Sequence, residues 1–287
     1  MQGAPEDLPL TVYTPRNTAT GWVAPIISAS CELHRSRTLI WHLFLRDFHA
    51  QFRQRLLGYI WALLTPLIAI FGFIIMNLSG ILRPGDIGVP YPLYVFVGVS
   101  IWGFLTTTLT AVSNGLLNQS DLLLRTNIPK IALAVSSLAQ VGYSVVVHSV
   151  VLVLLLIAFQ VRPSILVVVY PILVVPIILC GVALGLVVSV IGAIARDLTV
   201  IVQTAFNLLM YLTPVVYVAS NVENGILQLI IWLNPFTYLI ELPRSVLLKG
   251  SSDLWGFYLV VFGLALILLA LCVKAFYMLQ DLVAERL

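Results

Sequence analysis

The feature that most constrains this chain is the length of its uncharged stretches. No Asp, Glu, Lys or Arg occurs between Arg55 and Arg83, and most residues in that interval are apolar. About 20 apolar residues in a helix cross the hydrocarbon core of a bilayer, so this run is long enough for one span. Only 9% of the 287 residues are charged, whereas a soluble domain carries about 25%. The sequence therefore predicts an all-α integral membrane protein.

Charge-poor runs of this kind predict six transmembrane helices. The expected spans cover residues 58–80, 92–115, 133–160, 165–194, 198–220 and 254–274, within a membrane domain of residues 56–287. An even number of spans places both termini on one side. If that side is the cytoplasm, only four of the fifteen basic residues lie outside, namely Arg83, Arg162, Arg244 and Lys249. This distribution satisfies the positive-inside rule, so we expect both termini in the cytoplasm.

Residues 31–55 predict a basic amphipathic helix that runs directly into the first span. Apolar side chains recur every four residues, at Ile40, Phe44 and Phe48, and charged residues fall largely on the other sides. A helix with aromatics on one side and arginines on the other suits the plane of a membrane surface. The preceding residues 1–30 lack the basic start and apolar stretch of a secretory signal, so we expect a cytoplasmic arm there.

The apolar segment at residues 224–248 is interrupted and predicts a re-entrant helical hairpin before the last span. Its two apolar halves are each too short to cross a bilayer, and Asn234 and Pro235 lie between them. Broken backbone is tolerated at membrane depth only where protein buries it or water lines it. Glu241 and Arg244 are three residues apart and can pair on one helix face. A hydrophobic outer loop in the membrane interface is the alternative interpretation.

The span interiors lack the groups that ion-coupled transport and intramembrane catalysis require. His148 is the one ionisable residue in the middle of a predicted span, and a lone histidine there more often hydrogen-bonds a neighbouring helix than carries protons. Protease, hydrolase and phosphate-loop motifs are absent from the sequence. The three cysteines have neither disulfide nor metal-site spacing, and a net charge of +3 does not indicate nucleic-acid binding. We expect no catalytic site, bound cofactor or metal, and any ATP used must be hydrolysed by another subunit.

Two further features have alternative interpretations. Aromatic side chains in and beside the spans include Tyr59, Trp61, Trp102, Tyr211 and Tyr217. They are either interfacial anchors or the lining of a sugar conduit, because an aromatic face packs against the C–H face of a pyranose. In the second cytoplasmic loop, Asp121 and Arg125 flank three leucines. This stretch is either a short helix that docks a partner or an ordinary turn.

Four stretches together resemble a known family: FRQRLLGYIWALLTPL, LLLRTNIPK, ARDLTVIVQTAFNLLMYLTPVVY and NPFTYLIELPRSVLLKG. They are similar to the transmembrane subunits of type-2 ABC exporters. The branch with the closest resemblance exports bacterial cell-surface polysaccharides such as O-antigen, capsule and teichoic acid. The arginine-rich junction followed by LLGYIWALLTPL is the most specific of the four.

The resemblance implies a homodimer in the bacterial inner membrane, two cytoplasmic ABC ATPase subunits that bind ATP and Mg²⁺, and a polysaccharide or lipid-linked polysaccharide substrate. By position it assigns ATPase coupling to Arg46, Asp47, Arg53, Arg55, Asp121 and Arg125. Among the aromatic residues we expect Tyr59, Trp61, Trp102, Tyr211 and Tyr217 to line the channel. The resemblance implies that the re-entrant hairpin forms an outer gate, with Asn234, Pro235, Glu241 and Arg244 as its residues. Two alternative functions are an exporter of drugs or lipids with the same architecture and a membrane enzyme acting on lipid-linked sugars.

Overall fold

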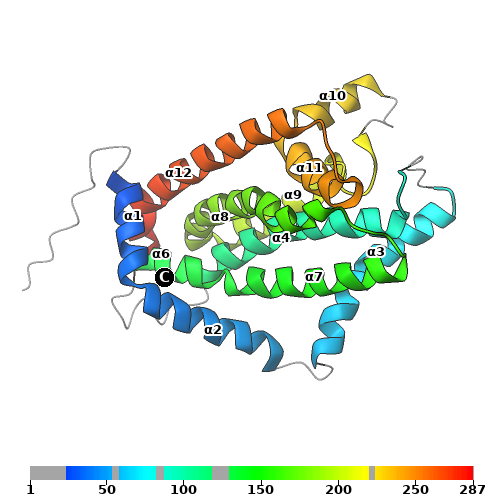
Figure 1. The fold of residues 1–287 in the computed structure, drawn as a ribbon. Coiled ribbons are helices and arrows are strands. Elements are labelled where there is room, and N and C mark those ends of the chain that lie inside the picture. The colour runs from blue at the N-terminus through cyan, green and yellow to red at the C-terminus, as the bar shows by residue number, and fades with distance from the viewer. Residues whose placement is uncertain (1–23, 54–57, 82–86, 118–128, 220–223, 287) are drawn as a thin grey trace, which may run out of the picture.

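The computed structural model describes residues 24–53, 58–81, 87–117, 129–219 and 224–286, and every regular element in these ranges is helical (Figure 1). The helices are α1 (Ala24–Arg35), α2 (Arg37–Arg53), α3 (Gly58–Leu78), α4 (Tyr91–Leu117), α6 (Lys130–Ser136), α7 (Ala139–Ala158), the 3₁₀ helix η1 (Ile165–Val169), α8 (Tyr170–Ile194), α9 (Arg196–Leu212), α10 (Gly225–Leu233), α11 (Pro235–Lys249) and α12 (Trp255–Arg286). The all-α prediction is confirmed for these residues.

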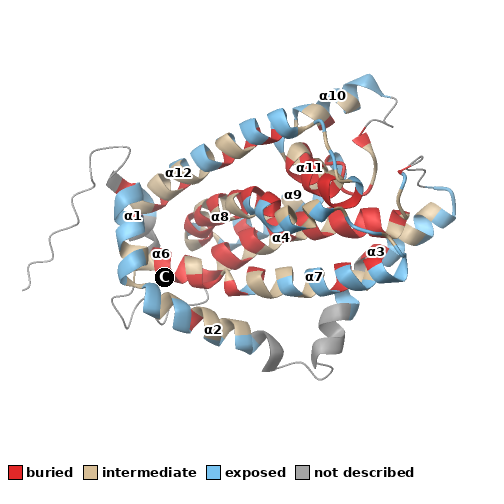
Figure 2. Cartoon of the chain, viewed as in Figure 1, coloured by how far each residue is buried: buried red, intermediate tan, exposed pale blue. Residues whose placement is uncertain are grey.

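α4 lies at the centre of the bundle. It contacts α3, α6, α7, α8, α9 and α11, and 72% of its membrane-length segment is buried, against 22–33% for the other long apolar helices. Leu93, Ile101 and Leu105 are completely buried, and Figure 2 shows the buried residues concentrated on α4, α8 and α11. A helix that is apolar on every side is stable only where other elements surround it, so the sequence of α4 suits this position.

Close contact between α4 and α8 depends on two glycines. Gly181 and Gly185 are four residues apart and therefore lie on one face of α8. A Cβ at Gly181 would lie 2.9 Å from the carbonyl oxygen of Leu105, and one at Gly185 would lie 3.0 Å from that of Leu109. Small residues at this spacing let two membrane helices approach until their backbones touch.

Four stretches among the described residues are long and apolar enough to cross a membrane. These are Tyr91–Gly115, Lys130–Ala158, Ile165–Ile194 and Trp255–Leu279, which correspond to four of the predicted spans. The bent pair α10–α11 makes a fifth if it is counted as one broken span. The outward faces of α7, α8 and α12 carry exposed aliphatic side chains, as expected for surfaces that face lipid.

The two remaining predicted spans correspond to α3 and α9. α3 coincides with the span expected at residues 58–80, but its described apolar part is Leu64–Leu78. α9 ends at Leu212, whereas the expected span ran to residue 220. Its 17 residues rise only about 25 Å. Thr213 adopts an extended conformation (φ −106°, ψ 140°), because the following Pro214 disfavours a helical conformation in the residue before it. The count of six spans therefore stays a prediction.

The predicted amphipathic helix consists of two helices. Helical structure begins at Ala24, inside the segment expected as an arm, and Ser36 separates α1 from α2. α1 is held by a tertiary contact, since the Tyr277 hydroxyl of α12 donates a hydrogen bond to Glu32 (2.7 Å). Its Ala29 is buried in a cluster with Leu43 of α2. These contacts explain why helix extends further toward the amino terminus than the amphipathic pattern alone predicts.

The bundle has two distinct ends. α1, α6 and the carboxyl-terminal part of α12 meet at one end, and α10, α11 and the start of α4 meet at the other (Figure 1). We call them the α1 end and the hairpin end. α1 and the hairpin therefore lie at opposite ends of the described bundle (Figure 1).

Replacing Gly181 with alanine is expected to lower thermal stability, because the new methyl group would also lie 2.7 Å from Cβ of Thr108. Overpacking of this kind costs about 1–3 kcal/mol. Thermal unfolding of the purified protein measures the effect. Gly103→Ala on α4 is the matched control, since nothing lies within 4 Å of a Cβ at that position. Equal melting temperatures for the two variants would contradict the importance of the close α4–α8 contact.

Candidate functional site

The α10–α11 pair forms the interrupted apolar segment that the sequence predicts. The two helices meet at an angle of 82°, and Asn234 lies between them with extended dihedrals. Its Oδ1 accepts a hydrogen bond from the backbone N–H of Phe236 (3.0 Å), which caps α11. Pro235 occupies the first turn of α11, where a missing N–H has no cost. Asn234 and Pro235 therefore end one helix and start the next, as their residue types favour.

Side chains of α11 fasten it to α10. The hydroxyl of Thr237 donates to the carbonyl of Ile231 (2.6 Å), and the hydroxyl of Tyr238 donates to that of Trp232 (2.8 Å). The last carbonyls of a helix lack N–H partners within it. Here the backbone N–H of Asn234 reaches the carbonyl of Ile231 (3.3 Å), and the two hydroxyls add further donors. The bend is thus fixed by hydrogen bonds on its inner side.

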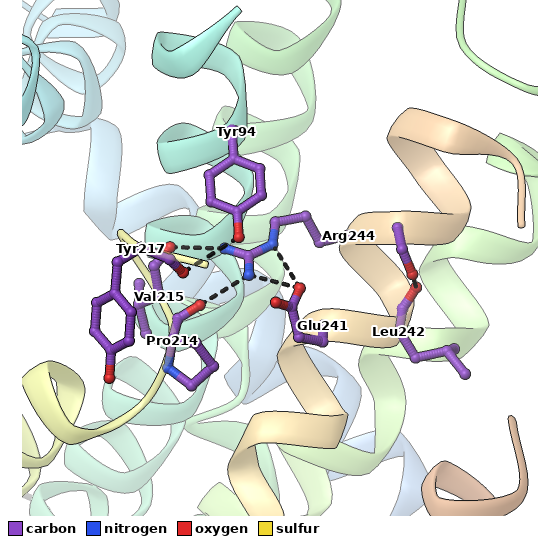
Figure 3. Close-up of polar contacts among 8 residues, drawn as sticks. Tyr94, Pro214, Val215, Tyr217, Glu241, Leu242 and Arg244 are labelled. Atoms are coloured by element: carbon purple, nitrogen blue, oxygen red, sulfur yellow. Dashed lines mark hydrogen bonds and ion pairs between the residues drawn. The ribbon is translucent and has the colours of Figure 1, made fainter. Parts of the chain in front are cut away.

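Arg244 of α11 is the most deeply buried charged residue described, with 1% of its surface exposed. Figure 3 shows its guanidinium between Glu241, Tyr94 and the segment that follows α9. Nη2 contacts Oε2 of Glu241 at 2.6 Å, and Nε donates to the same oxygen at 3.2 Å. Nη1 donates to the carbonyl of Val215 and Nη2 to that of Pro214, each at 2.8 Å. The guanidinium carbon lies 3.8 Å from the centre of the Tyr94 ring, a cation–π contact.

Two tyrosines of α4 complete this arrangement. The hydroxyl of Tyr91 donates to the carbonyl of Val216 (3.1 Å), and that of Tyr94 donates to the carbonyl of Tyr217 (3.2 Å). All four carbonyls of Pro214–Tyr217 therefore accept hydrogen bonds from side chains. Non-helical backbone in a membrane protein needs such partners, because lipid offers no donors. We call Tyr91, Tyr94, Glu241, Arg244 and these carbonyls the arginine cluster.

Gly98 allows the arginine cluster to pack against α4. It lies one turn beyond Tyr94, and a Cβ there would overlap the carbonyl oxygen of Val215 and lie 2.9 Å from Nη1 of Arg244. The position therefore requires a residue without a side chain. Nearby, Nδ2 of Asn234 donates to the hydroxyl of Thr213 (2.9 Å), which links the hairpin to the start of the same segment.

The four residues expected at an outer gate are thus brought together by the structure. Asn234 and Pro235 form the bend, and Glu241 and Arg244 form an ion pair on α11. Pro243 lies between the paired residues, and α11 continues through it. The arrangement joins α4, the segment after α9 and the hairpin in one polar network.

The residues expected to line a channel lie in different environments. Trp102 on α4 is buried, with its ring edge-on to Phe236 of α11 (5.7 Å between centroids) and no partner for Nε1 among the described residues. Tyr211 at the end of α9 is 59% exposed. The hydroxyl of Tyr217 donates to the carbonyl of Tyr211 (3.3 Å). Tyr59 and Trp61 lie on α3, in a part where side chains are not described.

Only some of the residues expected to couple to ATPases lie in the described part of the structure. Arg46 and Asp47 on α2 form an ion pair with each other (2.8 Å), and about half of the Arg46 side chain is exposed. Arg53 ends α2, and its side chain is not described. Arg55, Asp121 and Arg125 lie outside the described residues. Among the described residues, no group of three or more His, Cys, Asp or Glu side chains is arranged to hold a metal ion.

α2 contacts the bundle through its aromatic side chains. The rings of Trp41, Phe44 and Phe48 stack in sequence along the helix. Phe44 packs on Gly142 of α7, where a Cβ would lie 3.3 Å from Cζ of the ring, and Phe48 meets Tyr143 edge-on. The aromatic stripe seen in the sequence therefore packs against α7 along part of its length, while Trp41 remains 58% exposed.

Comparison with known proteins identifies the family. The model of the ABC-2 type transporter family matches residues 38–248, which extend from α2 almost to the end of α11. The chain belongs to the ABC-2 type transporter family. The O-antigen export system permease protein RfbA of Myxococcus xanthus is 26% identical to it over 217 residues, or 75% of this chain and 82% of that protein. The resemblance found from the sequence motifs is thereby confirmed, and the arginine cluster lies within the matched part of this ABC-2 transporter.

Sequence reasoning missed several residues of this ABC-2 transporter that the site depends on. Tyr91 and Tyr94 were passed over, although two tyrosines three residues apart at the start of a span indicate a polar helix face. Gly98 follows on the same face. Thr204 and Asn207 of α9 lie outside the arginine cluster and were also missed, although polar residues one turn apart in an apolar helix are an available signal.

Replacing Arg244 is expected to release the segment after α9. Arg244→Met leaves Glu241 unpaired and two buried carbonyls without donors, and breaking a buried pair costs about 3–5 kcal/mol. Arg244→Lys should have an effect between those of the unmodified protein and Arg244→Met, since an ammonium group does not span the carboxylate and both carbonyls as the planar guanidinium does. Hydrogen exchange of residues 215–219 in the purified transporter measures the release. Lys249→Met, at an exposed position of the same helix, is the control, and unchanged exchange in Arg244→Met would contradict the role of the cluster.

Proposed function

We propose that this chain is the membrane-spanning subunit of an ATP-driven exporter that moves a lipid-linked cell-surface polysaccharide across the bacterial inner membrane. Membership of the ABC-2 transporter family supports a transport subunit. The name of the Myxococcus xanthus relative, an O-antigen export permease, supports a polysaccharide as the cargo. In this proposal two copies of the chain associate with two ABC ATPase subunits, which bind ATP and Mg²⁺.

The observation that carries the proposal is a polar stripe on α9. Gln203, Asn207 and Tyr211 recur every four residues and so share one face, with Thr204 beside them. Thr204, Asn207 and Tyr211 are exposed, and Gln203 is half-buried. Amide side chains are costly against hydrocarbon, so an exposed polar face on a membrane helix favours contact with water or protein. A second copy facing this stripe would enclose a polar path.

The other exposed edge of α9 is apolar. It carries Leu198, Ile201, Leu208 and Leu212. α9 thus has a polar edge suited to a path for sugars and an apolar edge suited to lipid or to the second copy. The exposed ring of Tyr211 lies on the polar edge, where its face is available to a passing pyranose.

The two ends of the bundle have complementary roles in this proposal. The α1 end faces the cytoplasm, as the distribution of basic residues favours, and receives the ATPases on α1, α2 and the loop that contains Asp121 and Arg125. α2 then acts on α7 through Phe44 and Phe48. The hairpin end faces outward and forms the gate, which the arginine cluster holds closed.

Reconstitution with an ABC ATPase tests the function. The purified chain and an ATPase encoded beside it should form a complex in lipid nanodiscs, and lipid-linked polysaccharide should stimulate its ATP hydrolysis several-fold. The same polymer without its lipid, and a hydrophobic drug, are the comparison substrates. Stimulation by the drug but not by the polymer would instead favour a drug exporter, and ATP hydrolysis by this chain alone would refute a separate ATPase.

Cysteine labelling tests the path along α9. In a background with Cys31, Cys180 and Cys272 replaced, Asn207→Cys should react with a membrane-impermeant maleimide during turnover, because thiolate formation needs water. Ile201→Cys on the apolar edge of α9 is the control and should react at least ten times more slowly. Equal labelling rates would show that the polar stripe does not line an aqueous path.

A further inference from the structure

A cavity of about 80 Å³ lies between α4, α7 and α8, away from the arginine cluster. Most of its wall is apolar, and three of its lining residues, Phe96, Ser100 and Phe104, lie four residues apart on one face of α4. His148 and Ser149 of α7 line it opposite α4. The cavity is thus an apolar space with a few polar groups on facing helices.

Ser100 has no hydrogen-bond partner among the described residues. Only 3% of its surface is exposed, and its Oγ is buried without a donor or acceptor nearby. The other buried hydroxyls of α4 behave differently, since Thr108 and Ser113 donate to carbonyls of their own helix. An unsatisfied buried hydroxyl costs about 1–3 kcal/mol, so Ser100 indicates a partner other than the described residues.

His148 faces Ser100 across the cavity. Its ring lies 5.9 Å from that of Phe96 and 5.4 Å from that of Phe104, between centroids. Since Ser100 is midway between these two residues on the helix face, the imidazole lies opposite the serine. The sequence favoured a hydrogen bond from His148 to a neighbouring helix, whereas Nδ1 contacts the carbonyl of Ser144 in its own helix (2.7 Å).

The hydrogen bond to Ser144 determines which ring nitrogen carries the hydrogen. A carbonyl only accepts, so Nδ1 is the donor, and in a neutral imidazole Nε2 is then an acceptor. The neutral form is the one expected here, because an unpaired cation is costly among apolar helices. His148 therefore presents an acceptor and Ser100 a hydroxyl, which is both donor and acceptor.

We propose that this cavity is a hydration site, in which ordered water bridges Ser100 Oγ to Nε2 of His148 and so links α4 to α7. A water molecule needs roughly 10–15 Å³ of such space and two to four polar partners. The cavity offers room for several waters, and Ser149 and Tyr170 are among the residues that line it. A lipid chain fits less well, because it would fill the space and leave Ser100 unsatisfied.

A double-mutant cycle tests the bridge. If water joins the two residues, Ser100→Ala lowers the melting temperature by about 2–4 °C, which corresponds to the loss of one hydrogen bond. In the His148→Phe background the same substitution should change the melting temperature by less than about 1 °C. Ser113→Ala is the control, since that buried hydroxyl bonds within α4. Its effect on the melting temperature should be the same with and without His148.

A dry cavity predicts the opposite sign. Ser100→Ala would then leave stability unchanged or raise it, because it deletes an unsatisfied hydroxyl. A high-resolution density map of the unmodified protein gives an independent measurement that does not require variants to fold. Compact density between Ser100 and His148 supports the proposal. An empty cavity, or elongated density that leaves between Ser149 and Pro171 as a lipid chain would, overturns it.

Discussion

The structure depends on side-chain hydrogen bonds to the four backbone carbonyls of Pro214–Tyr217, which lie outside any helix. α9 ends before Pro214, and the next residues run through the buried interior at the hairpin end. Lipid has no donors to offer these carbonyls, and water does not reach them in the buried interior. Side chains from α4 and α11 therefore supply the donors. Arg244 makes four hydrogen bonds to Glu241 and two carbonyls from a single planar group, which lysine does not. The position of α11, and with it the bend of the hairpin, follows from this requirement.

α4 connects the features described above. It carries Tyr91 and Tyr94 of the arginine cluster, Gly98 and the hydroxyl of Ser100. Its carboxyl-terminal half packs against the two glycines of α8. Because α4 is surrounded by helices on all sides, it has little freedom to move alone. In the proposed function, a gate at the hairpin can therefore open only if the carbonyls of Pro214–Tyr217 exchange their donors. Water that enters an opening path can replace the tyrosine hydroxyls, whereas nothing but a second charged group replaces Arg244 equally well.

Local patterns predicted the parts of this fold that depend on nearby residues. Four of the predicted spans, the interruption at Asn234-Pro235 and the Glu241–Arg244 pair follow from composition and from spacings of a few residues. The end of α9 before Pro214 and the glycine pair of α8 follow from local rules too, although the hydropathy pattern hid them. The contacts of Tyr91 and Tyr94 were out of reach, because they join residues more than 120 positions apart. Trp102 was expected in a channel from its type alone, and burial beneath Phe236 is a tertiary property.

α12 gives the two ends of the bundle a direct physical connection. Near its carboxyl end Tyr277 bonds to Glu32 of α1, and near its start Phe257 stacks on Tyr238 of α11 (5.3 Å between centroids). Between these points it packs along α8, and the hydroxyl of Tyr258 donates to the carbonyl of Leu173. A continuous helix transmits displacement along its axis better than a chain of loops does. In the proposed function, α12 is therefore the continuous route from α1 to the hairpin, and the contacts of α2 with α7 are a separate route. In the proposed function, the donors to Pro214–Tyr217 are the contacts at the hairpin end of this route that have to change when the gate opens.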